Sequence, residues 1–269
     1  MQGAWSTVQS SCRRQRESIC DGTAAPKQPS EGMRGARRDH HGLGELTVNR
    51  ANIVPVGDWT LEETGAHQGP VDGHEDKRQF TLLLAISLSV QLLPPQVLYQ
   101  GKTDACHARF NFPEEWDVYH TTSHWSNTDS MERYVETVVN PYMAAQRERL
   151  GLEEDHPGMA IFDVYKAHRT PGLLAKLKAA NTQPLFVPAS CTGELQPLGA
   201  DGSINDALKK DLTQSFSDFY AEKVEAGTSI ENVKMDLRLS AIKPLHANWF
   251  LGAVDRLATK PDVIARGWE

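Results

Sequence analysis

Residues 79–90 read QFTLLLAISLSV, an apolar run that is almost unbroken. A strand with one face in water alternates apolar and polar residues, whereas a strand covered on both faces does not need to. We therefore predict a largely buried strand at this position. A membrane-spanning helix is not expected, because residues 81–93 are interrupted by Thr, Ser and Gln and are too short to cross a bilayer.

Other segments of the chain supply the partners that a buried strand requires. Further extended segments are predicted at residues 46–56, 93–102, 159–164 and 184–189. Helices are predicted at residues 126–151, 170–181, 204–227 and 241–258. This order of strands and helices predicts an α/β protein with a mixed sheet flanked by helices.

Composition divides the 269-residue chain into three parts. Residues 1–44 are rich in Ser, Gln, Gly and Arg without an apolar period, which predicts a disordered leader. Residues 45–258 are predicted to form one domain, and residues 259–269 a C-terminal tail. The net charge is −7, and the leader contributes seven basic against four acidic residues. The remainder is therefore acidic, so any contact with a polyanion must be local or bridged by metal.

Two acidic residues stand near the ends of predicted strands. Asp163 ends the apolar part of AIFDVYKAHRT, residues 160–170, and Asp201 lies just before the helix that follows the next strand. In one interpretation each carboxylate caps a turn. In the other, the two acids converge at one edge of the sheet, where proteins display catalytic or metal-binding groups.

Several long and unusual stretches bear on this choice: NIVPVGDWTLEETGAHQ (52–68), DKRQFTLLLAISLSVQLLPPQVLYQGKT (76–103), FNFPEEWDVYHTTSHWSNTDSM (110–131), AIFDVYKAHRTP (160–171), LFVPASCTGELQPL (185–198) and LRLSAIKPLHANWF (237–250). In this order they resemble the transposase domain of the pogo/Tigger group, relatives of jerky and centromere protein B that are described as DDE superfamily endonucleases. The resemblance implies an RNase H-like fold and cut-and-paste DNA chemistry. It also implies two Mg²⁺ ions held by three carboxylates.

The resemblance assigns these acids residue by residue. Asp163 matches the second acid of the family. Asp201 matches the third if residues 199–200 are a two-residue insertion. The position of the first acid is occupied by Thr47, whose neutral hydroxyl cannot bridge two dications. Glu45 is a weak substitute, because on a strand it lies roughly 7 Å from Thr47.

Four further residues of the matching motifs are candidates for supporting roles. His168 is either a residue behind the metal ligands or a structural histidine. Lys166 and Arg169 either contact phosphate or are simply solvated. Gln196 belongs to the loop that leads to the third acid, and we predict that it shapes that loop.

Cysteine and histidine spacing gives no zinc motif. None of the cysteines forms a CxxC pair, so a structural zinc site is not expected; they are Cys12, Cys20, Cys106 and Cys191. His120 and His124 have a metal-like spacing, but they lie in a stretch that resembles family sequence without a known metal site.

The resemblance and its departures together predict a function. We expect a transposon-derived nucleic-acid-binding domain in the nucleus that binds double-stranded DNA, either transposon-end-like or non-specific, and that is catalytically impaired at its Mg²⁺ site. One alternative is an active Mg²⁺-dependent endonuclease or transposase. Another is a domesticated protein-interaction module without DNA binding. The resemblance is also compatible with a homodimer.

Overall fold

The computed structural model describes the backbone of residues 43–52 and, in addition, residues 79–189, 191, 195–199, 204–225 and 238–268. The predicted leader lies outside these residues up to residue 42. The last two residues of the predicted leader, 43 and 44, belong to a strand that begins at Leu43. The first strand therefore starts two residues before the predicted domain boundary at residue 45.

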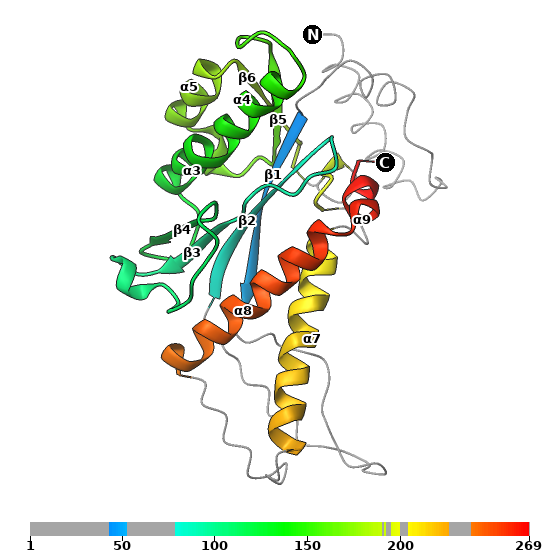
Figure 1. Ribbon diagram of the computed structural model, residues 1–269. Coiled ribbons are helices and arrows are strands. Elements are labelled where there is room, and N and C mark those ends of the chain that lie inside the picture. The colour runs from blue at the N-terminus through cyan, green and yellow to red at the C-terminus, as the bar shows by residue number, and fades with distance from the viewer. Residues whose placement is uncertain are drawn as a thin grey trace, which may run out of the picture.

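The described strands form one six-stranded sheet (Figure 1). The strands are β1 (Leu43–Asn52), β2 (Gln79–Ser87), β3 (Gln96–Gln100), β4 (Asp117–Thr121), β5 (Gly158–Phe162) and β6 (Thr182–Phe186), in the spatial order β4-β3-β2-β1-β5-β6. β2 pairs antiparallel with both β1 and β3. On the other side of β1, β5 pairs parallel with β1, and β6 pairs parallel with β5. This mixed arrangement confirms the predicted RNase H-like α/β fold.

Helices cover both faces of the sheet. One layer contains α3 (Thr128–Tyr134), a π-helical segment η2 (Val135–Val139), α4 (Asn140–Arg149) and α5 (Pro171–Ala179). The other contains α7 (Ile204–Glu225), α8 (Leu239–Ala258) and α9 (Pro261–Arg266), and Figure 1 shows α7 and α8 lying side by side on their face. Among the described helices, none is long and apolar enough to cross a membrane.

The two layers explain why β2 is apolar along its length. Leu82 and Leu84 pack into the core that the sheet forms with α7, α8 and α9. Leu83 and Ala85, which alternate with them, pack into the separate core formed with α3, α4 and α5. All four side chains are at most 1% exposed, which confirms the predicted buried strand.

Three elements differ from the sequence prediction. β4 was not expected, because DVYHT is short and polar. Among the described strands it pairs only with β3, to which it runs parallel. The helix predicted at 126–151 is one continuous rod with η2 at its centre. The predicted tail at 259–269 contains α9, whose Val263 and Ile264 are buried in the core with α8.

A buried polar network attaches α3 to the β4 edge of the sheet. The Asp117 side chain on β4 is 2% exposed and accepts hydrogen bonds of 2.6 Å from both Gln96 Nε2 and Arg133 Nε. Gln96 Nε2 also donates to the carbonyl oxygen of Ser130, at 2.9 Å. Asn127 caps α3 by accepting a hydrogen bond from the Ser130 amide. The network joins β3, β4 and α3 through one carboxylate.

Replacing Arg133 by alanine should destabilise the protein by about 2 kcal/mol, because the buried carboxylate of Asp117 then loses its only described charged partner. Arg149→Ala is the matched control, since Arg149 is exposed on α4 and should change the free energy of unfolding by at most about 0.5 kcal/mol. Urea denaturation of both variants measures the difference. Equal losses would show that the Asp117 network does not hold α3.

Candidate active site

Asp163 directly follows β5, at the end of the strand where the chain turns away from the sheet. Its Oδ1 accepts a hydrogen bond of 2.9 Å from the Tyr165 amide, which is the turn cap foreseen from the sequence. The same Oδ1 lies 2.6 Å from Nδ1 of His168, and the Asp163 side chain is 30% exposed. Asp163 is therefore both a local cap and a rigidly held carboxylate open to solvent.

His168 contacts the Asp163 carboxylate from the interior of the protein. It lies in a short 3₁₀ turn, η3 (Lys166–Arg169), and is completely buried, with its ring against those of Phe162 and Tyr165. Its Nε2 has no hydrogen-bond partner among the described residues. Burial acts to raise the pKa of Asp163, but the hydrogen bond and charge of His168, together with the Tyr165 amide, outweigh it and lower that pKa below its ordinary value of 3.8.

Tyr165 and Ser126 fix the loop that carries Asp163, a role that the sequence did not indicate. The Tyr165 hydroxyl donates a hydrogen bond of 2.9 Å to the carbonyl oxygen of Ser126, which connects the loop to the start of α3. Only the position of Tyr165 two residues after Asp163 could have drawn attention to it, because a hydrogen bond to a distant backbone oxygen leaves no local signal.

The strand register places Thr47 beside Asp163. β1 and β5 are parallel neighbours in which Leu46 pairs with Phe162 and Glu45 with Ile161. The next residues along the two strands are Thr47 and Asp163, so they stand at the same level of the sheet. Glu45 is two residues lower, roughly 7 Å away along the strand. Thr47 therefore occupies the backbone position beside Asp163 at which a second carboxylate would be expected.

The other predicted site residues fall in different environments. Lys166 and Arg169 are exposed in η3, and the Arg169 guanidinium lies 5.8 Å from the centre of the Phe186 ring. Gln196 is 2% exposed, and its carbonyl oxygen accepts a hydrogen bond of 2.8 Å from the amide of Gly199. Asp201 lies outside the described residues, so its predicted approach to Asp163 stays a prediction.

The described residues fit a Mg²⁺ site only in part. Asp163 supplies a hard oxygen ligand, as Mg²⁺ prefers, and no described residue donates a hydrogen bond to its Oδ2. A two-metal centre needs several bridging carboxylates, yet the neighbouring position at this level is threonine. Among the described residues, the site thus contains one of the three expected acids.

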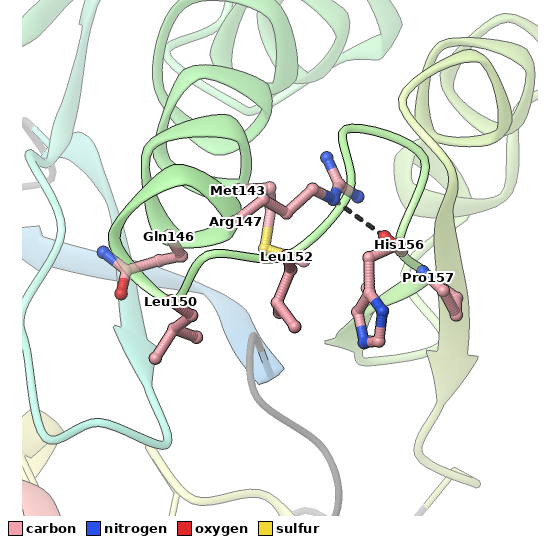
Figure 2. Close-up of a pocket in the computed structure, with 8 residues that line it drawn as sticks. Met143, Gln146, Arg147, Leu150, Leu152, His156 and Pro157 are labelled. Atoms are coloured by element: carbon pink, nitrogen blue, oxygen red, sulfur yellow. Dashed lines mark hydrogen bonds between the residues drawn. The ribbon is translucent and has the colours of Figure 1, made fainter.

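A pocket lies at the opposite end of β5 (Figure 2). Gly158 is at its wall and begins the strand, so the pocket lies roughly 16 Å from Asp163 along β5. Figure 2 shows Arg147 pointing toward the backbone of His156. The Arg147 guanidinium donates to the carbonyl oxygens of His156 and Ala180, at 2.7 and 2.8 Å. These contacts give Arg147 a structural role in joining α4 to the neighbouring loops.

Comparison with known proteins identifies relatives of the chain. It is 31% identical over 117 residues to human "Pogo transposable element with ZNF domain", which covers 44% of this chain and 8% of the relative. It is 22% identical over 188 residues to mouse (Mus musculus) "Pogo transposable element with KRAB domain", which covers 69% of this chain and 28% of the relative. The chain therefore spans less than a third of the length of either relative.

Solved structures of Mos1 transposase are also similar. The Mos1 paired-end complex with the left transposon end aligns with a TM-score of 0.42 and 10% identity, over 96% of this chain and 69% of that chain. The catalytic domain of Mos1 mariner transposase aligns with a TM-score of 0.38 and 9% identity, over 91% and 98%. The family model described as DDE superfamily endonuclease matches residues 77–268, which is more than half of the sequence. This chain therefore belongs to the DDE superfamily endonuclease family.

Proposed function

We propose that this protein is a transposon-derived domain that binds double-stranded DNA and has lost most of its capacity to cleave it. The observation that carries the proposal is the register of β1 against β5, which sets Thr47 level with Asp163. In a DDE-type site the carboxylates position the two metal ions, so a hydroxyl at this level removes a charged ligand. Membership of the DDE superfamily endonuclease family supports descent from a DNA-binding protein. A nuclear location is part of the same proposal.

Exposed cationic side chains near Asp163 support DNA binding at the end of β5. Lys166 and Arg169 belong to η3, within six residues of Asp163, and both side chains face solvent. The Arg169 guanidinium packs near the Phe186 ring, which restricts its freedom at the edge of β6. Because the chain has a net charge of −7, attraction to phosphate has to come from such local groups.

The salt dependence of DNA binding tests this proposal. The double variant Lys166→Ala/Arg169→Ala should bind a double-stranded oligonucleotide more weakly, and the slope of log K against log salt should shrink by roughly 2, since each phosphate contact contributes about 0.9. Fluorescence anisotropy titrations over a series of salt concentrations measure the slope.

Lys178→Ala is the matched control for these titrations. Lys178 is exposed near the end of α5, close to the start of β6. It therefore lies at the opposite end of the strands from Asp163, so its loss should leave the slope unchanged. If the unmodified protein fails to bind DNA at low salt, the proposal is wrong and a protein-interaction module becomes the better explanation. Equal slopes in all variants would exclude η3 as the DNA contact.

A further inference from the structure

A second group of ligand-type side chains lies at the β4 edge of the sheet, in the connection from β3 to β4. Cys106 ends a short 3₁₀ turn, η1 (Asp104–Cys106), His107 follows it, and His120 lies on β4. One ligand atom from each of these three residues lies within 4.8 Å of the other two. The two histidine side chains are each 17% exposed.

The two histidine nitrogens lie at about the spacing of two ligands in a tetrahedral metal site. His107 Nε2 and His120 Nδ1 are 3.1 Å apart, while two nitrogens bound to one zinc ion at 2.0–2.1 Å would be about 3.3 Å apart. Asp104 Oδ1 lies 3.4 Å from His120 Nδ1 and 3.8 Å from His107 Nε2. The carboxylate is therefore close enough to act as a fourth ligand.

We propose that Cys106, His107 and His120 bind one zinc ion, with Asp104 as an exposed fourth ligand. Thiolate and imidazole groups favour zinc over Mg²⁺, which prefers oxygen ligands. This site is separate from the one that contains Asp163 and does not depend on the proposed function. The simpler interpretation is a hydrogen bond between His107 and His120 with a bystander thiol, and the experiment below distinguishes the two.

The surroundings of Cys106 hold its side chain in the cluster. A Cβ atom at Gly101 would lie 2.4 Å from the Cys106 sulfur, so only glycine at this position allows the close approach. Lys243 on α8 donates a hydrogen bond of 2.5 Å to the Cys106 carbonyl oxygen and lies 5.2 Å from the centre of the Tyr99 ring. Its positive charge is near enough to offset the negative charge that a thiolate and a carboxylate would bring.

A metal ion here would stabilise an otherwise weakly structured connection. β3 and β4 are parallel, so the chain must cross over between them, and residues 101–116 do so with η1 as their only regular element. Such connections are commonly helical and held by their own hydrogen bonds. An ion bound by both η1 and β4 would clamp the crossover to the edge strand.

Cobalt(II) binding tests the site, because cobalt replaces zinc and its bound thiolate absorbs in the near ultraviolet. The reduced, chelator-treated full chain should bind one Co²⁺ ion with a thiolate-to-cobalt band, and Zn²⁺ should displace it. Cys106→Ser should remove the band, and His120→Gln should weaken Co²⁺ binding by roughly 100-fold or more, since even an outer-shell change usually costs 10–100-fold.

His156→Gln is the matched control, because His156 lines the pocket at the far end of β5 and should leave Co²⁺ binding unchanged. Circular dichroism before metal addition establishes that each variant is folded, and the two ligand variants lie on different elements, so the result does not depend on one of them. The proposal is overturned if the protein binds no stoichiometric Co²⁺, or if the thiolate band persists in Cys106→Ser.

Discussion

Replacing Thr47 by aspartate is expected to increase Mg²⁺-dependent nicking of supercoiled plasmid DNA by roughly 100-fold over the unmodified protein. The loss of an outer-shell partner typically costs a metal site 10–100-fold in activity, and a missing ligand should cost at least as much. The substitution restores a carboxylate at the level of Asp163, because Thr47 follows Leu46, which pairs with Phe162. Gel electrophoresis of plasmid incubated with Mg²⁺ or Mn²⁺ measures the gain.

Two controls separate restored chemistry from contamination. Thr47→Asn changes the side chain without adding charge and should give no gain. Thr47→Asp combined with Asp163→Ala should return nicking to the background level. If the unmodified protein already nicks DNA and Asp163→Ala abolishes this, the impairment proposal is wrong and the protein is an active endonuclease. A folded Thr47→Asp variant without any gain would contradict the placement of the first acid at this position.

Replacing Phe250 by alanine is expected to destabilise the protein by about 4 kcal/mol. Phe250 on α8 is 1% exposed, and its ring lies 5.1 Å from that of Trp116 and 6.4 Å from that of Phe80 on β2. Removing the ring leaves a cavity between the helix and the sheet. Since small domains are stable by only about 5–15 kcal/mol, this loss should be a large part of the total.

Leu239→Ala is the control for this effect on the same helix. Leu239 begins α8 and is 41% exposed, so its truncation should change the free energy of unfolding by about 0.5 kcal/mol or less. Urea denaturation followed by circular dichroism gives both values. If the two variants lose equal stability, the packing of Phe250 between α8 and the sheet does not contribute to stability as expected.

Much of the fold follows from patterns that are local in the chain. The apolar run of residues 79–90 predicted a buried strand, and β2 (Gln79–Ser87) has helices on both of its faces. The long helix predicted at 204–227 matches α7 (Ile204–Glu225) within two residues. These elements are predictable because each depends on a periodicity of apolar residues that is visible within one segment.

The candidate active site was predictable only through family resemblance. Asp163 stands at the end of a strand, but the same residue also makes an ordinary turn cap, and no local pattern separates these roles. That Thr47 stands level with Asp163 depends on the register of two strands more than a hundred residues apart. The support from Tyr165 and His168 likewise depends on how the loop folds back on α3 and β5.

The amino-acid sequence alone was enough to predict the buried central strand and most of the helices, and the family resemblance made Asp163 and Asp201 the candidate acids. Tertiary structure was needed to reveal β4, the burial of α9 and the contact between His107 and His120. The sequence shows only a metal-like spacing between His120 and His124, whereas the parallel pairing of β3 and β4 places His120 beside His107 and Cys106. The physical reason is that side-chain periodicity acts over a few residues, whereas strand pairing and packing join residues far apart in the chain.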